Sequence, residues 1–364
     1  MHPEKPDRPA VLQCFNNIQT EAIRWLWPAR IARGKLTLVV GPPGTGKSQL
    51  GVYLAAMTSR GRPLADGSEC HPGNVIILSA EDDPADTIKP RLEAGDADMD
   101  RVFILDVVRD TNRQGEPVAR RFNLQSDMRV LDAEIARLGD VALLIIDPIS
   151  AYLGSVDSHS NAKVRGFLAY LSAMASRCGI AIVAVSHLNK GNGSAIDRVT
   201  GSGAFVAAAR ASYLVCKDRD DANTRLFLPI KNNLGNDSTG LAFRIEAAEL
   251  PSGVQTSRIV WEPGVVKVSA DEALTAPTNP SARRAVDEAK TFLLEALSQG
   301  PQTAKDLRAD ANGMGLSWAA VRRAQHQLGI RPVKVGYQGV WMWFIPGLGP
   351  FELLEGVQMP QHEN

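Results

Sequence analysis

The stretch Leu36-Thr37-Leu38-Val39-Val40, followed by Gly41-Pro42-Pro43-Gly44-Thr45-Gly46-Lys47-Ser48, decides the fold class of this chain. The apolar run predicts a buried strand, the glycine-rich octet predicts a loop, and residues 49–59 are compatible with a helix. Glycines at this spacing leave backbone N–H groups free to wrap an anion, and the start of the helix adds a partial positive charge. We therefore expect a phosphate-binding loop in which Lys47 reaches the outer phosphates of ATP, Ser48 ligates Mg²⁺, and Gln49 completes the nucleotide site.

The overall composition is that of a globular protein and argues against several other classes. Of the 364 residues 44% are hydrophobic, and 40 basic residues balance 40 acidic ones, so net charge alone does not indicate nucleic-acid binding. The length suits about two or three domains. The longest apolar runs fall far short of the roughly 18 residues of a membrane span, and the first residues lack a signal-peptide pattern. We expect a cytoplasmic protein without membrane contact.

The cysteines give no sign of a disulfide framework or a zinc site. They are far apart in the sequence, without any C-x-x-C spacing, at Cys14, Cys70, Cys178 and Cys216. The only metal that we expect is therefore Mg²⁺.

Short β-branched runs alternate with helical patterns from about residue 35 to residue 217. This alternation predicts an α/β fold with a mostly parallel sheet covered on both faces. A helix with an N-cap at Ser126 and a stop at Gly139 would form one crossover. From 212 to 261 the pattern changes to short strands separated by turns, which predicts hairpins at the sheet edge. The predicted parallel strands are Leu36–Val40, Val75–Ser79, Val102–Leu105, Val141–Ile146 and Ile180–Ser186.

The C-terminal third predicts a separate helical module. We expect an N-terminal arm at 1–20, the α/β domain at 21–262, a linker at 263–282, the module at 283–347 and a tail at 348–364. A first helix spans 284–299, Thr303 and Asp306 form a capping box for a second, and Ser317 caps a third ahead of a ribbon at 332–345. This order predicts a winged helix-turn-helix, whose third helix could enter a major groove. Nine basic residues against five acidic ones in 283–347 allow DNA contact, but such modules also dock proteins.

Polar residues end several of the predicted strands, where open α/β folds place their ligands. Asp147 follows an apolar strand. A carboxylate in this position typically holds Mg²⁺ opposite the serine of the phosphate loop, here Ser48. The alternative is that Asp147 simply starts a turn before a proline. Glu81 could deprotonate the attacking water, while Asp82 or Asp83 caps the next helix. His187 would stand between these carboxylates, and could sense the γ-phosphate, if its strand lies between those of the loop and Asp147. An ordinary turn residue is the alternative for His187.

These motifs, together with Arg210, resemble the RecA-type ATPase core of RepA-like hexameric replicative helicases over about residues 21–261. The resemblance implies that Lys47 and Ser48 hold ATP and Mg²⁺, that Glu81 is the catalytic base, and that Asp147 coordinates the metal. It further implies that His187 is the phosphate sensor and that Arg210 is an arginine finger reaching a neighbouring subunit's nucleotide. Transition-state charge explains the need for such an arginine. A solvated cation at a helix end is the alternative for Arg210.

A weaker resemblance connects Lys231-Asn232-Asn233-Leu234-Gly235 with the K-N-R-F-G motif of the RadA branch of the same superfamily. Asn233 replaces the arginine of that motif and Leu234 replaces its phenylalanine. Lys231 remains as a possible second basic group that reaches a neighbour's nucleotide. The chain lacks the zinc-finger cysteines and the protease-like domain of RadA itself.

Together these features predict an ATP- and Mg²⁺-dependent motor that forms a homo-oligomeric ring, for which a hexamer is the model, on DNA. Two Gly/Ser-rich loops, 154–165 and 189–203, would line the pore and follow a single strand, or else be plain surface loops. The module at 283–347 would meet duplex DNA. Replication of a plasmid, phage or other mobile element is the expected role. A non-processive recombination or repair ATPase and an ATP-gated DNA-binding regulator are the alternatives.

Overall fold

The computed structural model of the chain divides into two compact units, Met1–Thr275 and Ala276–Asn364. It describes residues 12–345 apart from gaps at 112–115, 155–160, 189–194, 196–197, 199–202, 220, 236, 275–279, 299, 331–332 and 336–339. Most of the two predicted pore loops therefore lies outside the described residues. Within them, no helix combines the length and apolar character that crossing a bilayer demands.

The first unit is built on a sheet of nine strands in the described residues, in the order β13-β12-β11-β10-β3-β9-β8-β4-β5. The five predicted parallel strands are confirmed to within about two residues at each end. The parallel part comprises β3 (Leu36–Gly41), β4 (Asn74–Ser79), β5 (Val102–Ile104), β8 (Val141–Asp147), β9 (Ala181–His187) and β10 (Ala211–Lys217).

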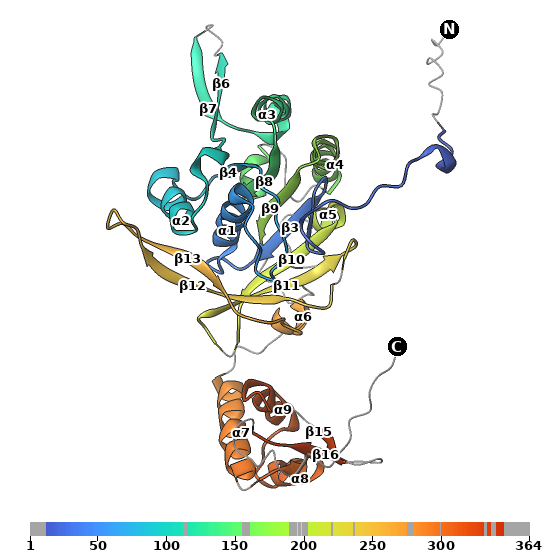
Figure 1. Cartoon of the computed structure of the whole chain (residues 1–364), viewed down its shortest axis with the longest axis vertical. Coiled ribbons are helices and arrows are strands. Elements are labelled where there is room, and N and C mark those ends of the chain that lie inside the picture. The colour runs from blue at the N-terminus through green and yellow to red at the C-terminus, as the bar shows by residue number, and fades with distance from the viewer. Residues whose placement is uncertain are drawn as a thin grey trace. The chain divides into compact units, whose positions relative to one another are not determined.

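Helices cover both faces of this sheet (Figure 1). On one face lie α1 (Lys47–Arg60) and α2 (Lys89–Ala94), and on the other α3 (Leu124–Leu138), α4 (Asn161–Cys178) and α5 (Gly203–Ala208). Successive residues of a strand point to opposite faces, so Val39 belongs to the α1 core and Val40 to the α3–α4 core. Burial on both faces explains why these strands read as continuous apolar runs.

The expected edge hairpins are present beyond β10. They comprise β11 (Thr224–Asn232), β12 (Leu241–Glu249) and β13 (Gln255–Trp261), each antiparallel to its neighbour. A short pair before the main sheet, β1 (Trp25–Trp27) and β2 (Ile31–Ala32), is fixed by Trp27, whose ring stacks on Phe227. Short helical turns complete the unit: η1 (Phe15–Asn17), η2 (Pro84–Ile88), η3 (Met99–Arg101) and η4 (Ile149–Tyr152).

Three details of the first unit differ from the prediction. The helix α3 begins at Leu124, because Asn123 rather than Ser126 accepts the capping hydrogen bond, from the Gln125 N–H at 2.8 Å. The linker expected at 263–282 starts too early, because Val266 bridges to Gly240 and α6 (Ala270–Leu274) packs on the core. An unpredicted two-stranded ribbon, β6 (Val107–Thr111) with β7 (Pro117–Arg121), precedes α3.

The second unit contains three long helices and a three-stranded antiparallel sheet in the described residues. Its core joins Leu293, Leu307, Val321 and Trp343, each almost fully buried. Thr303 caps α8 by accepting a hydrogen bond from the Asp306 N–H. The elements are α7 (Pro280–Ser298), β14 (Gln302–Thr303), α8 (Ala304–Gly313), α9 (Trp318–Gln327), β15 (Val333–Val335) and β16 (Val340–Trp343), with the sheet in the order β14-β16-β15.

Candidate nucleotide-binding site

The phosphate-binding loop connects the central strand β3 to α1. Gly46 takes a left-handed conformation with φ of 95° and caps the helix, and Gly44 has φ of 69°. The Thr45 hydroxyl donates to the Pro42 carbonyl at 2.9 Å. The buried ammonium of Lys47 donates to the carbonyls of Gly41 at 3.0 Å and Pro42 at 2.8 Å. A phosphate group is a stronger acceptor for this ammonium than two neutral carbonyls, because it is ionised.

Asp147 closes β8 beside the loop. Its carboxylate accepts a hydrogen bond from the Ser48 side chain, and burial raises the pKa of this carboxyl above its usual value. Burial also lowers the pKa of Lys47, against the attraction of Asp147 and Glu81. The buried Lys47 and Asp147 and the exposed Glu81 are thus close enough for their charges to influence one another.

The three acidic residues after β4 make three different kinds of contact. Asp83 accepts from the Ala85 and Asp86 N–H groups at 2.7 and 3.2 Å and caps η2. Asp82 forms an ion pair with Arg91 at 2.7 Å. Glu81 takes neither role, and its exposed side chain lies with Oε1 3.5 Å from Nε2 of His187. The two neighbours therefore have structural partners, whereas Glu81 is free to act at the site.

His187 lies between the loop and the carboxylates, as the sequence predicts for a strand in that place. In the register, Gly41 pairs with His187 and Ser79 pairs with Asp147, so all four strand ends lie at one edge of the sheet. The Nδ1 atom of His187 is buried and has no hydrogen-bond partner among the described residues. A buried nitrogen in this state is a candidate for a contact with a bound group.

The donor set at this edge fits ATP with Mg²⁺. Ser48 and Asp147 offer two hard oxygen atoms in mutual contact, and Mg²⁺ commonly takes one or two protein oxygens and completes its octahedron with phosphates and water. Two protein oxygens are few for an all-protein site, so this pair suits a cation that also binds phosphate.

The comparison with protein families agrees with this geometry. A family model of an AAA domain, from a family of RecA-like P-loop ATPases, matches residues 3–193, just over half of the chain. The chain belongs to this family. ATP binding, and the Mg²⁺ that usually accompanies it, are what such a P-loop ATPase implies. No curated protein sequence matches the chain.

The match leaves out parts of this P-loop ATPase that the sequence singles out. Arg210, Lys231, the strands β10 to β13 and the whole second unit lie beyond residue 193. Their roles therefore depend on geometry alone.

The side chain of Gln49, which the sequence predicts at the nucleotide site, makes an internal hydrogen bond. Gln49 is buried, and its Nε2 donates to the Ser257 hydroxyl of β13 at 2.7 Å. The β12–β13 hairpin also reaches the loop, since a Cβ on Gly46 would lie 2.8 Å from Cδ1 of Ile245. The side chain of Gln49 thus fastens α1 to the sheet extension, and a nucleotide contact of this residue stays a prediction.

Arg210 and Lys231 lie near the amino-terminal ends of the parallel strands β3 and β10. The phosphate loop of the same chain lies at the carboxyl ends. The Arg210 N–H donates to the Leu36 carbonyl at the start of β3. Lys231 donates to the carbonyls of Val206 and Ala209 at 3.0 Å each, at the end of α5. Burial and then the nearby Arg210 lower the pKa of Lys231. The structure therefore does not bring these two residues to the chain's own nucleotide site.

Arg210 borders a hollow of about 710 Å³ between α4, α5 and the start of β3, together with Lys35 and Arg165. Arg165 was expected in a pore loop, but the structure places it inside α4, which begins at Asn161. The sequence does not reveal this neighbour of Arg210, because residues 154–165 read as one Gly/Ser-rich loop. The hollow offers three cationic side chains to whatever packs against this edge.

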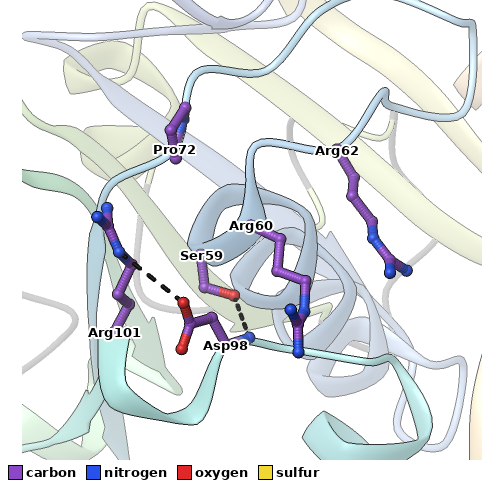
Figure 2. A pocket seen from close by; sticks show the side chains of 6 residues that line it. All are labelled: Ser59, Arg60, Arg62, Pro72, Asp98 and Arg101. Atoms are coloured by element: carbon purple, nitrogen blue, oxygen red, sulfur yellow. Dashed lines mark hydrogen bonds and ion pairs between the residues drawn. The ribbon is translucent and has the colours of Figure 1, made fainter.

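A second hollow, of about 400 Å³, lies at the C-terminal end of α1 (Figure 2). Its arginines already have acidic partners. Arg60 and Arg62 pair with Asp96, and Arg101 pairs with Asp98 at 3.9 Å. The Ser59 hydroxyl accepts from the Asp98 N–H in the same place. This ion-paired hollow is a structural junction at the far end of α1 from Lys47.

Proposed function

We propose that the chain is an ATP-hydrolysing motor that acts on DNA as an oligomer, in the manner of a RepA-like replicative helicase of a plasmid, phage or mobile element. The observation that carries the proposal is the row of strand ends β3, β9, β8 and β4. His187 and Asp147 end two of these strands, Glu81 lies in the turn after a third, and Lys47 begins the helix that follows the loop after β3.

The role proposed for each residue follows from its place. The glycine loop and Lys47 would hold the phosphates of ATP, and Ser48 with Asp147 would hold Mg²⁺, which supplies charge neutralisation at the phosphoryl oxygens. Glu81 would take a proton from water, since His187 is its one recorded side-chain partner among the residues that the structure describes. His187 would couple the position of Glu81 to the state of the site.

An oligomer is supported by the position of Arg210. It cannot serve the site of its own chain, because the phosphate loop lies at the other edge of the sheet. If the amino-terminal strand ends of one copy faced the carboxyl strand ends of the next, Arg210 and Lys231 would approach the nucleotide of that next subunit. Such a head-to-tail contact generates a ring when the rotation closes.

DNA as the target is supported by the second unit. Its helices α7, α8 and α9, followed by β15 and β16, come in the order that we expect of a winged helix-turn-helix, and residues 283–347 carry a modest basic excess. In this proposal α9 contacts duplex DNA while a single strand passes through the ring.

One experiment tests the main claim. ATP turnover is measured with no DNA, with single strands of increasing length and with duplex, while light scattering follows the mass. We expect Mg²⁺-dependent turnover that single strands stimulate with length, by an oligomer. An active oligomer that shows no ATP-dependent strand displacement would remove the helicase claim and leave the ATPase.

The separate core of the second unit favours one other function. A module that folds around its own residues could select a DNA site while slow hydrolysis in the first unit resets binding. Footprinting separates the two functions. Protection of one defined duplex site supports this regulator, whereas stimulation by single strands of any sequence supports the motor.

A further inference from the structure

The ribbon β6–β7 stands apart from the rest of the first unit. Its strands pair only with each other among the described residues, and Figure 1 shows the ribbon projecting past the helices from the region between β5 and α3. An isolated pair of strands is marginally stable in water, and of the ribbon's described residues Val108 alone is buried in the α3–α4 core. Its base must therefore be held by other contacts.

Arg120 holds the base of the ribbon. Its guanidinium donates two hydrogen bonds to the buried carboxylate of Asp127 in α3, at 2.6 and 2.7 Å, and a third to Asp110 across the ribbon at 2.6 Å. These bonds lower the pKa of Asp127. Phe122, directly after β7, is buried in the α3–α4 core. The ribbon is thus fixed in direction by charge-assisted, bidentate contacts.

The register sorts the residues of the ribbon onto two faces. Side chains of directly paired residues share a face, and successive residues alternate. The pairs Val108–Arg120 and Asp110–Val118 form the face held by α3. The other face, here called the free face, consists of Val107, Arg109, Thr111, Pro117, Ala119 and Arg121.

All six residues of the free face are exposed. In the part of the chain that the structure describes, the side chains of Arg109 and Arg121 form no ion pair with an acidic residue. They are diagonal neighbours on the ribbon, which sets their Cα atoms about 7–8 Å apart. Two exposed arginines without an ion pair therefore share one face of the ribbon.

We propose that the free face binds the phosphate backbone of double-stranded DNA; this rests on the proposed function of the chain. Arg109 and Arg121 contact neighbouring phosphates, since a planar guanidinium binds phosphate through paired hydrogen bonds. The small Thr111 and Ala119 let the backbone approach. A two-stranded ribbon also has the dimensions that the major groove admits.

The composition of the free face favours duplex over its competitors. Proteins that bind single strands stack bases on aromatic side chains, and none of the six residues is aromatic. Protein interfaces concentrate their energy in buried aromatic anchors, which are equally missing from these six. A rigid backbone that carries regular negative charge is the partner that remains.

The test compares the full chain with the double variant Arg109→Ala/Arg121→Ala. Binding to duplex DNA is measured at several salt concentrations by fluorescence anisotropy. Each lost phosphate contact removes about 0.9 from the slope of log K against log salt, so we expect the slope to fall by roughly two. Turnover of ATP without DNA stays unchanged. The matched control Arg129→Ala/Arg137→Ala removes two exposed charges from α3 and leaves the slope as it was.

Three results would overturn the proposal while leaving the ATP-hydrolysing motor of the proposed function intact. In the first, the slope of the ribbon variant is unchanged. In the second, the parent chain binds single strands but no duplex. In the third, the ribbon variant keeps its DNA affinity but loses oligomer mass. The last result would assign the free face to a second copy. A parent chain that hydrolyses ATP but binds no DNA of any kind would overturn both proposals.

Discussion

Three consecutive acidic residues, Glu81, Asp82 and Asp83, show how position separates chemistry from structure. Asp83 follows the strand at the distance where a side chain caps the next turn, and Asp82 meets Arg91. Glu81 comes first after the strand and points to His187. A carboxylate whose bonding capacity is not used by the fold is the one able to accept a proton from water.

Glu81→Gln should retain ATP binding and lower turnover by roughly 10² to 10⁴. The amide keeps the size of the side chain but cannot take a proton at neutral pH. Asp83→Asn makes the same chemical change two residues away, and asparagine caps a helix as well as aspartate does, so its turnover should match the parent chain. Steady-state turnover and nucleotide titration measure both variants. Near-normal turnover of Glu81→Gln would move the base role to another residue.

Gly46 carries a second testable constraint. Its φ of 95° is costly for any residue with a Cβ, and that atom would lie 3.3 Å from Phe243 and closer still to Ile245. Gly46→Ala should therefore distort the loop and weaken ATP binding at least tenfold, our estimate for misdirected backbone N–H groups. Gly67→Ala is the control, because Gly67 also has a positive φ but open space around it. It should lower the melting temperature slightly and bind ATP normally.

At the scale of elements, the sequence predicts the buried strands. It does not predict the elements whose position depends on single side-chain contacts. The β3 and β8 runs are apolar on both faces, so their positions follow from composition. The ribbon β6–β7 has no such run: it depends on Arg120 and Asp127, which meet only in the folded chain. The start of α3 was misplaced because both Asn123 and Ser126 are good caps, and only geometry chooses between them. Gln49 lies beside the loop in sequence, yet it packs against Ser257, 208 residues away.

The N-cap of α8 gives an element-scale prediction for the second unit. The Thr303 hydroxyl accepts from the Asp306 N–H at 3.0 Å and meets the Asp306 carboxylate at 2.7 Å. Thr303→Ala should destabilise this unit by about 1 kcal/mol, the usual cost of losing an N-cap. Ser298→Ala, at the exposed end of α7, should cost much less. Thermal unfolding followed by tryptophan fluorescence reports the change, and equal effects of the two variants would contradict the capping role.

At the scale of the whole molecule, the two edges of the sheet carry complementary halves of one proposed site. Lys47, Asp147 and Glu81 lie at the carboxyl edge, and Arg210 lies at the amino edge beside the hollow with Lys35 and Arg165. A monomer cannot join the halves because the length of the strands separates them. Only a head-to-tail contact between copies can do so, and this requirement can be tested without knowledge of the number of subunits.

Mixing two inactive variants tests that requirement. Arg210→Ala and Lys47→Ala should each lose ATP turnover alone. In a mixed oligomer, an Arg210→Ala subunit keeps an intact phosphate site, and a Lys47→Ala neighbour supplies the missing arginine. With random assembly at equal amounts this pairing occurs at roughly a quarter of the interfaces, so turnover should recover to about that fraction if sites act independently. Mixing Lys47→Ala with Glu81→Gln is the control, because both defects lie in the same half and no interface is complete. If mixed oligomers form, as verified by mass, but neither the Arg210→Ala mixture nor the control regains ATP turnover, Arg210 does not act on a neighbour's nucleotide.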